Sequence, residues 1–450
     1  MNIIDFLVKK MALSPMREKI VRNLFWSVLG KVVTLLGSLF VGIVVARYLG
    51  PEQYGLMNYV ISYVFLFQVI STFGLDNIEI REEAKNDIHF TTILGTAFGV
   101  RCALAVLAIC LTVVTSLLFE SSLETTVLVT VYSLSVLANT FTVIRNYFLS
   151  IVQNEYVVKS EISRTMIGIS VKLTLLWMHA SLFWFIVASV LDVIFLASGY
   201  LVAYRTQIGH LRAWTFNRKY AFFLLREGFP LLLSSGAVII YQRIDQVMIG
   251  QMVDNVSVGY FSTASKFVEV LIFIPMMLSQ TISPVLVGIF KDDPVAYKQK
   301  SQLFMNLSLW LSMFLAAFVS ALSYWIILYS FGEAYLPAVA VLQVLAFKAP
   351  SVALSSSAGC MLVIEGLQKW AVIRDLLGCL VCVILNYFLL PRYGVLAAAA
   401  VAILSNVAAG YLADAFIPAY RHLFVQQSRS LLLGWKDLFH FQQLIKTSRP

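Results

Sequence analysis

The sequence predicts an all-α polytopic membrane protein with about 12 transmembrane helices, and its composition and the length of its apolar runs support this. Of the 450 residues, 60% are hydrophobic and only 13% are charged, whereas soluble domains have about 25% charged residues. A soluble chain of this length would expose too little polar surface to water. The apolar runs are long enough to cross the roughly 30 Å of hydrocarbon, which takes about 20 residues.

Each predicted span is an apolar run with few charges. Because a bilayer offers no water to satisfy backbone polar groups, each run is expected to be a helix. The predicted spans are 24–46, 54–75, 92–118, 126–149, 162–178, 182–203, 228–250, 258–287, 304–329, 337–364, 370–390 and 395–418.

The spans divide the chain into two expected lobes of six helices each. Apolar residues beside lysines at the N-terminus favour a short interfacial helix over a cleaved signal peptide. The C-terminal tail fits an interfacial helix and a disordered segment equally well. The expected parts are a cytoplasmic N-terminal segment 1–23, an N-lobe 24–203, a basic cytoplasmic linker 204–221, a C-lobe 222–418 and a cytoplasmic tail 419–450.

The distribution of Lys and Arg predicts the orientation. If the N-terminus is cytoplasmic, the inner segments hold 21 of the 33 basic residues, whereas the outer loops hold two, Arg47 and Arg392. Basic residues concentrate on the cytoplasmic side of membrane proteins. We therefore expect a multi-pass protein of the cytoplasmic (inner) membrane with both termini inside.

Ten basic residues remain inside or at the edges of the spans. A Lys or Arg at the bilayer centre costs about 2.5–3.5 kcal/mol on insertion scales. Some must therefore reach the headgroups, some must pair with acids, and some must line water. The ten are Lys31, Arg101, Arg145, Arg164, Lys172, Arg226, Arg243, Lys266, Lys348 and Arg374.

Helical spacing places several of these bases on polar stripes, and five spans each show one such stripe. Arg101 has no polar stripe and is expected to be structural. The intramembrane acids are about half as numerous as the bases, so a surplus of positive charge is expected to line a hydrated cavity. The candidate binding residues on or beside these stripes are Lys31, Asn139, Arg145, Lys172, Lys266 and Lys348, and the candidate coupling acids are Asp192, Asp245 and Glu269.

A faint internal repeat supports two related halves. Shifting the chain by 204 residues aligns "RYLGPEQYGLMNYVISYV" with "QMVDNVSVGYFSTASKFV", so that Gly55 meets Gly259 and Ser62 meets Lys266. Each copy contains a span end, a short polar turn, a Gly and a new span. Parallel repeats of this kind occur in transporters whose substrate site lies between the halves.

The segments that open the two halves resemble a known family. "GKVVTLLGSLFVGIVVARYLGPEQYGLMNYV" (30–60), "GFPLLLSSGAVIIYQRIDQVMIGQM" and "FGEAYLPAVAVLQVLA" (331–346) resemble the polysaccharide transporter family, the Wzx-like O-antigen and lipid-linked oligosaccharide flippases. This family is part of the multidrug/oligosaccharidyl-lipid/polysaccharide flippase superfamily. The resemblance implies two six-helix lobes around a central cavity that opens alternately to each side. It also places Gly55 where the second helix starts close against the first.

The resemblance implies a flippase for a polyprenyl-diphosphate-linked oligosaccharide such as an O-antigen unit. Lys and Arg suit the diphosphate oxygens, and the acids would couple transport to protons or sodium. Implied partners are the lipid-linked oligosaccharide, membrane lipids and a polysaccharide polymerase or glycosyltransferase. The alternative is an ion-coupled multidrug or small-molecule exporter of the same superfold, which would need acids at mid-depth.

Other functional classes lack the residues that they need. The outer loops are too short to carry an active site, so we do not expect an enzyme. Cys379 and Cys382 form a C-x-x-C pair inside a span without a second ligand pair, which predicts core packing rather than a metal site. No phosphate-binding Gly loop with Lys occurs, so no cofactor is expected. The basic rim fits anionic lipid rather than nucleic acid.

Overall fold

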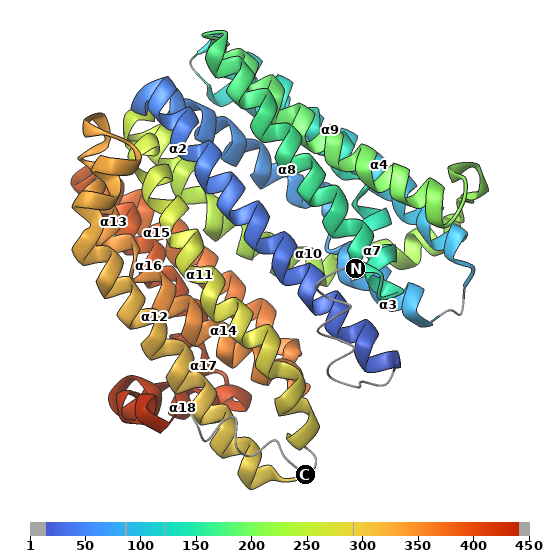
Figure 1. The fold of residues 1–450 in the computed structure, drawn as a ribbon, viewed down its shortest axis with the longest axis vertical. Helices are drawn as coiled ribbons and strands as arrows, with labels where there is room; N and C mark the ends of the chain where they lie inside the picture. Colours follow the sequence, from blue (N-terminus) through green and yellow to red (C-terminus); the bar gives the residue numbers. More distant parts are fainter. Residues whose placement is uncertain (1–14, 86–87, 121, 291, 441–450) are drawn as a thin grey trace. The chain divides into compact units, whose positions relative to one another are not determined.

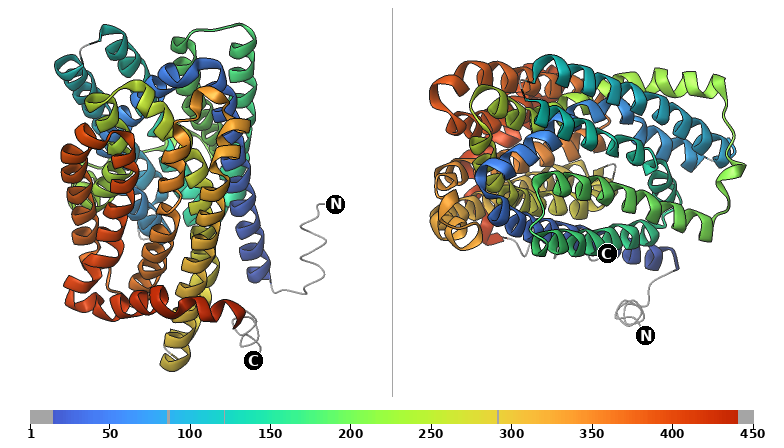
Figure 2. Two further views of the ribbon diagram at one scale, coloured as in Figure 1. Left: turned by 90° about the vertical axis from the view of Figure 1, so that its left-hand side faces the viewer. Right: turned by 90° about the horizontal axis from the view of Figure 1, so that it is seen from above.

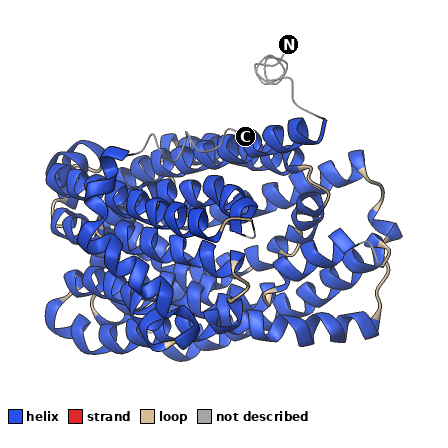
Figure 3. Ribbon diagram, turned by 90° about the horizontal axis from the view of Figure 1, so that it is seen from below, coloured by secondary structure: helices blue, strands red, loops and turns tan. Residues whose placement is uncertain are grey.

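The computed structural model describes residues 15–85, 88–120, 122–290 and 292–440, and within these ranges the chain is helical without any strand (Figures 1 and 3). The predicted all-α fold is confirmed. The expected interfacial segment 1–23 and the expected tail 419–450 lie partly outside the described residues.

The α-helices follow one another with short connections. Asp293 shows how the sequence starts one of them, because its carboxylate accepts hydrogen bonds from Val295 N (3.1 Å) and Ala296 N (2.9 Å), and Pro294 fits the first helical turn. The α-helices are α2 (Pro15–Thr72), α3 (Leu75–Lys85), α4 (Phe90–Phe119), α5 (Leu123–Ser133), α6 (Ser135–Asn139), α7 (Thr142–Ser150), α8 (Asn154–Trp177), α9 (Leu182–Gln207), α10 (Arg218–Met252), α11 (Asn255–Phe290), α12 (Pro294–Ser330), α13 (Ala338–Leu345), α14 (Lys348–Ile364), α15 (Ala371–Tyr393), α16 (Val395–Val407), α17 (Ala413–Phe416) and α18 (Arg421–Leu433).

Ten helical ranges of the described chain are long and apolar enough to cross a membrane. The multi-pass architecture is therefore confirmed, and the count of twelve stays a prediction. The first range, Val28–Lys85, contains Gly50, where the backbone leaves the helical conformation (φ 72°, ψ 172°). Helix α8 carries five charged residues and is not among the ten.

The chain divides into two compact units. Unit 1 joins the segment that ends at Val41 to Tyr63–Leu232, and unit 2 joins Gly42–Ser62 to the segment that begins at Leu233. The chain therefore passes between the units inside helices, at two points of α2 and one point of α10. The predicted six-helix lobes stay a prediction.

Each unit has its own apolar core. In unit 1, Leu75, Leu94 and Phe148 are fully buried and pack with neighbours from α3, α4, α7, α9 and α10. In unit 2, Phe304 and Met361 belong to a buried cluster that also includes residues of α11, α14 and α18. Many large apolar side chains outside these cores are exposed, as expected of surfaces that face lipid rather than water.

The two hairpins of the internal repeat pack against each other within unit 2, through the aligned glycines. A Cβ built on Gly55 would lie 1.7 Å from Asn255 O, and one built on Gly259 would lie 2.2 Å from Pro51 O. The shift of 204 residues converts Gly55 into Gly259 and Pro51 into Asn255, so the contact is reciprocal. The nearest neighbour of Gly55 is the start of α11, and the expected packing of Gly55 against the first helix stays a prediction.

Further contacts of the same hairpin occur in pairs that are related by the shift of 204 residues. Ser62 donates a hydrogen bond to Gln246. The equivalent pair, Gly42 and Lys266, is also close, since a Cβ on Gly42 would lie 3.7 Å from Lys266 Cε. At the hairpin tip, Arg47 donates a hydrogen bond to the carbonyl oxygen of Tyr329.

Helix α18 is attached to the other end of unit 2. His422 Nε2 lies 2.7 Å from Glu365 Oε2, and Tyr297 donates a hydrogen bond to Glu365 Oε1 (2.9 Å). The hydrogen bond to Glu365 raises the pKa of His422, because the carboxylate stabilises the imidazolium. The start of α18 is thereby tied to α12 and to the end of α14.

Replacing Gly259 by Ala should lower the melting temperature of the protein. The new methyl group would collide with a backbone carbonyl, and overpacking of this kind costs about 1–3 kcal/mol. This cost exceeds the ~1 kcal/mol by which Ala is favoured over Gly inside a helix. Thermal unfolding in detergent measures the change.

The control is Gly288→Ala on the same helix. A Cβ at Gly288 meets nothing within 4 Å, so this variant should melt at or slightly above the wild-type temperature. Equal melting temperatures for Gly259→Ala and Gly288→Ala would show that the glycine contact is looser than described.

Candidate functional site

A buried ionic network in unit 1 accounts for Arg101. The side chain of Arg101 is 1% exposed and contacts Glu79 Oε1 (2.8 Å) and Asp76 Oδ1 (2.6 Å). Asn146 donates hydrogen bonds to Asp76 Oδ1 (2.9 Å) and Glu79 Oε2 (2.7 Å). Thr142 accepts a hydrogen bond from Arg101 (3.0 Å). A buried charge is tolerated when it is paired and hydrogen-bonded in this way. The structural role expected for Arg101 agrees with this geometry.

A second buried pair lies in unit 2. Arg374 on α15 lies 3.4 Å from Asp414 Oδ1 on α17, and it also donates to Ala409 O at 3.0 Å and Ser355 Oγ at 3.3 Å. Both side chains are nearly inaccessible. Their charges therefore compensate each other and are not available to a substrate.

Lys172 and Asp192 form an ion pair between α8 and α9 of unit 1. Gly168, one turn before Lys172, makes the approach possible, because a Cβ at Gly168 would lie 2.3 Å from Asp192 Oδ1. One predicted binding residue and one predicted coupling acid therefore neutralise each other. Both side chains keep some exposure, at 17% and 18%.

The other predicted residues of unit 1 do not take part in ion pairs within the described chain. Within the described chain, Lys31 on α2 is exposed and Arg145 on α7 is partly buried, and neither has a carboxylate within ion-pair distance. The charge of Arg145 nevertheless acts on Asp76. Asn139 is partly buried, and its backbone carbonyl accepts a hydrogen bond from Thr142 Oγ1 at 2.8 Å.

In unit 2, Asp245 is fully buried and only half satisfied. Its Oδ1 accepts hydrogen bonds from Asn386 Nδ2 (2.6 Å) and from Cys382 Sγ (3.3 Å), which both come from α15. Asp245 Oδ2 and Asn386 Oδ1 are buried without a hydrogen-bond partner among the described residues. Each of these two oxygens can accept a hydrogen bond from a water molecule or a protonated group, or bind a cation.

The remaining predicted residues also belong to unit 2. Lys348, at the start of α14, is partly buried and acts electrostatically on Asp245. Lys266 Nζ lies 4.0 Å from Glu269 Oε2 on the same helix, which is the limit of an ion pair. The structure thus groups Asp245 with Lys348 and Lys266 with Glu269.

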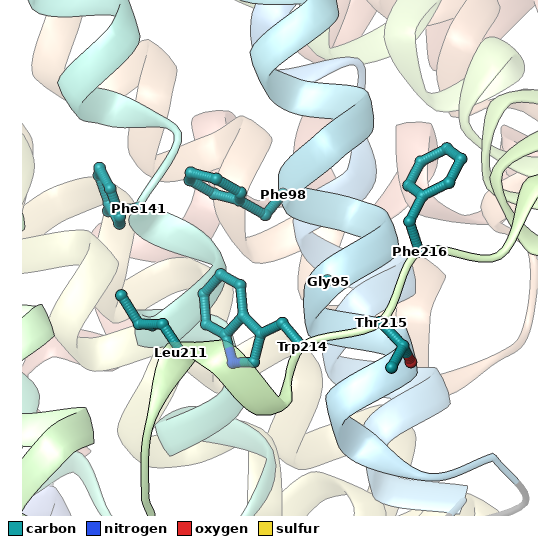
Figure 4. A pocket seen from close by; sticks show the side chains of 7 residues that line it. All are labelled: Gly95, Phe98, Phe141, Leu211, Trp214, Thr215 and Phe216. Atoms are coloured by element: carbon teal, nitrogen blue, oxygen red, sulfur yellow. The ribbon is translucent and has the colours of Figure 1, made fainter.

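An apolar cavity of about 330 Å³ lies in unit 1 and contains none of the predicted residues. Figure 4 shows Phe98, Phe141 and Trp214 facing one another across it, with the Phe98 ring centroid 5.0 Å from that of Phe141 and 5.4 Å from that of Trp214. Its lining of mainly aromatic side chains is that of a packed interior. Among the described residues no charged side chain lines it, so it offers no partner for a negatively charged headgroup.

Sequence reasoning missed Asp76 and Glu79 as partners of Arg101. The predicted spans 54–75 and 92–118 leave both residues in an inner segment, whereas the structure places both on α3, with Glu79 fully buried. Their spacing of three residues on one helical face was the available signal. Asn386 was also missed, because nothing in the sequence relates it to Asp245.

Solved structures of transporters share this fold at low sequence identity. A lipid II flippase MurJ in an inward closed conformation matches with a TM-score of 0.69 and 14% identity, over 92% of each chain. A transporter of the MOP superfamily from Pyrococcus furiosus matches with a TM-score of 0.60 and 15% identity, over 96% of this chain and 97% of the other. An inward-facing multidrug resistance transporter of the MATE family matches with a TM-score of 0.59 and 16% identity, over 92% and 96%.

The sequence itself gives the family. No curated protein matches the chain significantly. The family model described as polysaccharide biosynthesis protein matches residues 20–290, which is more than half of the chain. Together with the helical ranges that can cross a membrane, this match identifies the chain as a multi-pass membrane protein that belongs to the polysaccharide biosynthesis protein family.

Proposed function

We propose that this protein is a flippase that moves a polyprenyl-diphosphate-linked oligosaccharide across the cytoplasmic membrane by alternating access. The family match and the fold shared with a lipid II flippase support a lipid-linked glycan as substrate. The observation that carries the proposal is that, within the described chain, three of the predicted binding bases have no carboxylate within ion-pair distance: Lys31, Arg145 and Lys348.

These bases fit the chemistry of the substrate head. A diphosphate carries at least two negative charges, which cannot enter hydrocarbon uncompensated. Lys and Arg bind phosphate oxygens through charge-assisted hydrogen bonds. Lys266 adds a base that is only weakly engaged by Glu269. Asn139 would contact sugar hydroxyls, while the polyprenyl tail stays in lipid.

The alternative function is an ion-coupled exporter of drugs or other small molecules, which the MATE fold similarity supports. A cationic drug would need uncompensated acids within the spans. Of the three predicted acids, Asp192 is neutralised by Lys172, Glu269 lies at the 4.0 Å limit of an ion pair with Lys266, and Asp245 is under the electrostatic influence of Lys348. The charge balance therefore favours an anionic substrate.

Asp245 is the acid best suited to couple transport to a proton or sodium gradient. Its free oxygen and that of Asn386 would accept a proton or contribute oxygen ligands to a cation. Lys348 acts on the same carboxylate. If the substrate head engages Lys348, Asp245 loses part of its compensation and takes up the proton or cation more readily. Such a coupling between two sites is reciprocal.

Replacing Lys31, Arg145 or Lys348 by Gln should lower transport at least about tenfold without preventing folding. Loss of one charge-assisted hydrogen bond is worth about 1.5–3 kcal/mol, or a loss of roughly tenfold or more in activity. Complementation of a strain that lacks its own flippase measures transport, and expression with thermal unfolding measures folding. Exchanges of Lys for Arg should retain part of the activity, because phosphate responds mainly to charge.

The matched control is the double variant Lys172→Gln/Asp192→Asn. It removes a base together with its acidic partner, so it should fold and complement. Full complementation by the Gln variants at all three positions would disprove substrate binding by these bases.

Asp245→Asn should remove the dependence of transport on an imposed ion gradient. The amide has nearly the same shape but neither titrates nor carries charge. Uptake into vesicles with and without a proton or sodium gradient measures the effect, and Lys172→Gln/Asp192→Asn should keep the wild-type dependence. An unchanged dependence in Asp245→Asn would exclude this residue as the coupling group.

A further inference from the structure

Helix α18 begins where the chain leaves the last membrane-crossing range. That range ends at Phe416, and only Ile417 and the 3-10 turn Pro418–Tyr420 separate it from Arg421. Figure 2 shows α18 lying across the ends of the unit 2 helices instead of continuing along them. Connectivity therefore holds α18 at the boundary between hydrocarbon and water.

The inner face of α18 is fixed against unit 2, so the helix cannot turn about its axis. Gln427 is fully buried and donates to Gly410 O at 2.6 Å. Ser430 is also buried; its carbonyl accepts a hydrogen bond from Trp310 Nε1 (2.9 Å), and its hydroxyl donates to Asn306 Oδ1 (2.6 Å). These contacts join α18 to α12 and to the π-helical stretch Ala408–Leu412 that follows α16, and they determine which side chains point outward.

The outer face of α18 combines exposed aliphatic side chains with bases. Val425 is 64% exposed and Leu432 is 74% exposed. Arg421 and Arg429, which lie four residues to either side of Val425, are also exposed. This spacing places the four residues on one side of the helix. In water alone the aliphatic side chains of this face would be exposed unfavourably. In hydrocarbon alone its bases would lack solvation.

The turn after α18 extends this face and adds no exposed acid. Trp435 is 48% exposed, and Lys436 beside it is exposed. Asp437 is the only acid in residues 421–440, and its carboxylate accepts a hydrogen bond from Asn306 Nδ2 at 2.6 Å. The side chain of Asp437 is therefore bound to α12, while the bases stay outside.

We propose that the outer face of α18 binds the headgroup layer of the membrane leaflet at this end of unit 2, with a preference for anionic lipids. Val425, Leu432 and Trp435 enter the boundary between headgroups and acyl chains, and Arg421, Arg429 and Lys436 contact lipid phosphates. Such a mixture of apolar and basic residues is characteristic of interfacial helices, and each base near an anionic surface adds to the attraction. The proposal is independent of the transported substrate.

The first test measures the depth of α18 with a nitroxide label on Leu432→Cys in vesicles that contain phosphatidylglycerol. The five native cysteines are replaced by Ala, and a label on Asp292→Cys, in an exposed loop, is the control. The label at residue 432 should collide more often with oxygen than with a polar nickel complex, and the label at residue 292 should show the opposite. Free access of the nickel complex to residue 432 would indicate a water-facing or protein-binding surface and would overturn the proposal.

The second test needs no label and uses the native cysteines. Phosphatidylglycerol should raise the melting temperature of the wild-type protein more than phosphatidylcholine does, and Arg421→Gln/Arg429→Gln should lose most of this difference. The control Arg205→Gln/Arg212→Gln removes two exposed bases of unit 1. It should keep the wild-type difference in melting temperature between the two lipids. Equal lipid dependence in both double variants would contradict the proposal.

Discussion

The cost of a charge inside hydrocarbon determines how this protein is built. Ten bases lie in or beside the spans, and the structure compensates several of them with acids from neighbouring helices. Arg101 holds α3 and α7 together, Lys172 joins α8 to α9, and Arg374 joins α15 to α17. Each pair fixes the rotation of two helices, because a helix that turned would leave a charge in lipid without a partner.

The same compensation separates paired charges from charges without an acidic partner in ion-pair range. A base with a buried acidic partner has its charge neutralised, whereas Lys31 and Arg145 have no carboxylate within ion-pair distance in the described part of the chain. Asp245 is intermediate, since one oxygen is bonded and the other is not. A half-satisfied buried group is costly to maintain, and a water molecule, a proton or a cation at the second oxygen would lower that cost.

The fold could be predicted because it follows from the composition and from the length of the apolar runs, and the sequence shows both directly. The pairings could not, because they depend on which faces of distant helices meet. Lys172 and Asp192 were both singled out, but their contact depends on Gly168 and on the packing of α8 against α9. Asp76 and Glu79 fall outside the predicted spans because their charges lower the local hydropathy, although Arg101 pairs with both and makes the burial of Glu79 favourable. Asn386 lies 141 residues from Asp245, beyond the reach of any local pattern.

The reciprocal glycine contact has a consequence for how such a chain could arise. In a two-fold symmetric homodimer, the interface is isologous: if one residue touches a second across the axis, the second touches the first on the other side. Gly55 with Asn255 and Gly259 with Pro51 satisfy this relation inside a single chain. A half-length ancestor could therefore have closed the same contact between two identical subunits. After duplication and fusion, each hairpin would still pack against the backbone of the other. A larger residue at either glycine would therefore require the backbone of the opposite repeat to move.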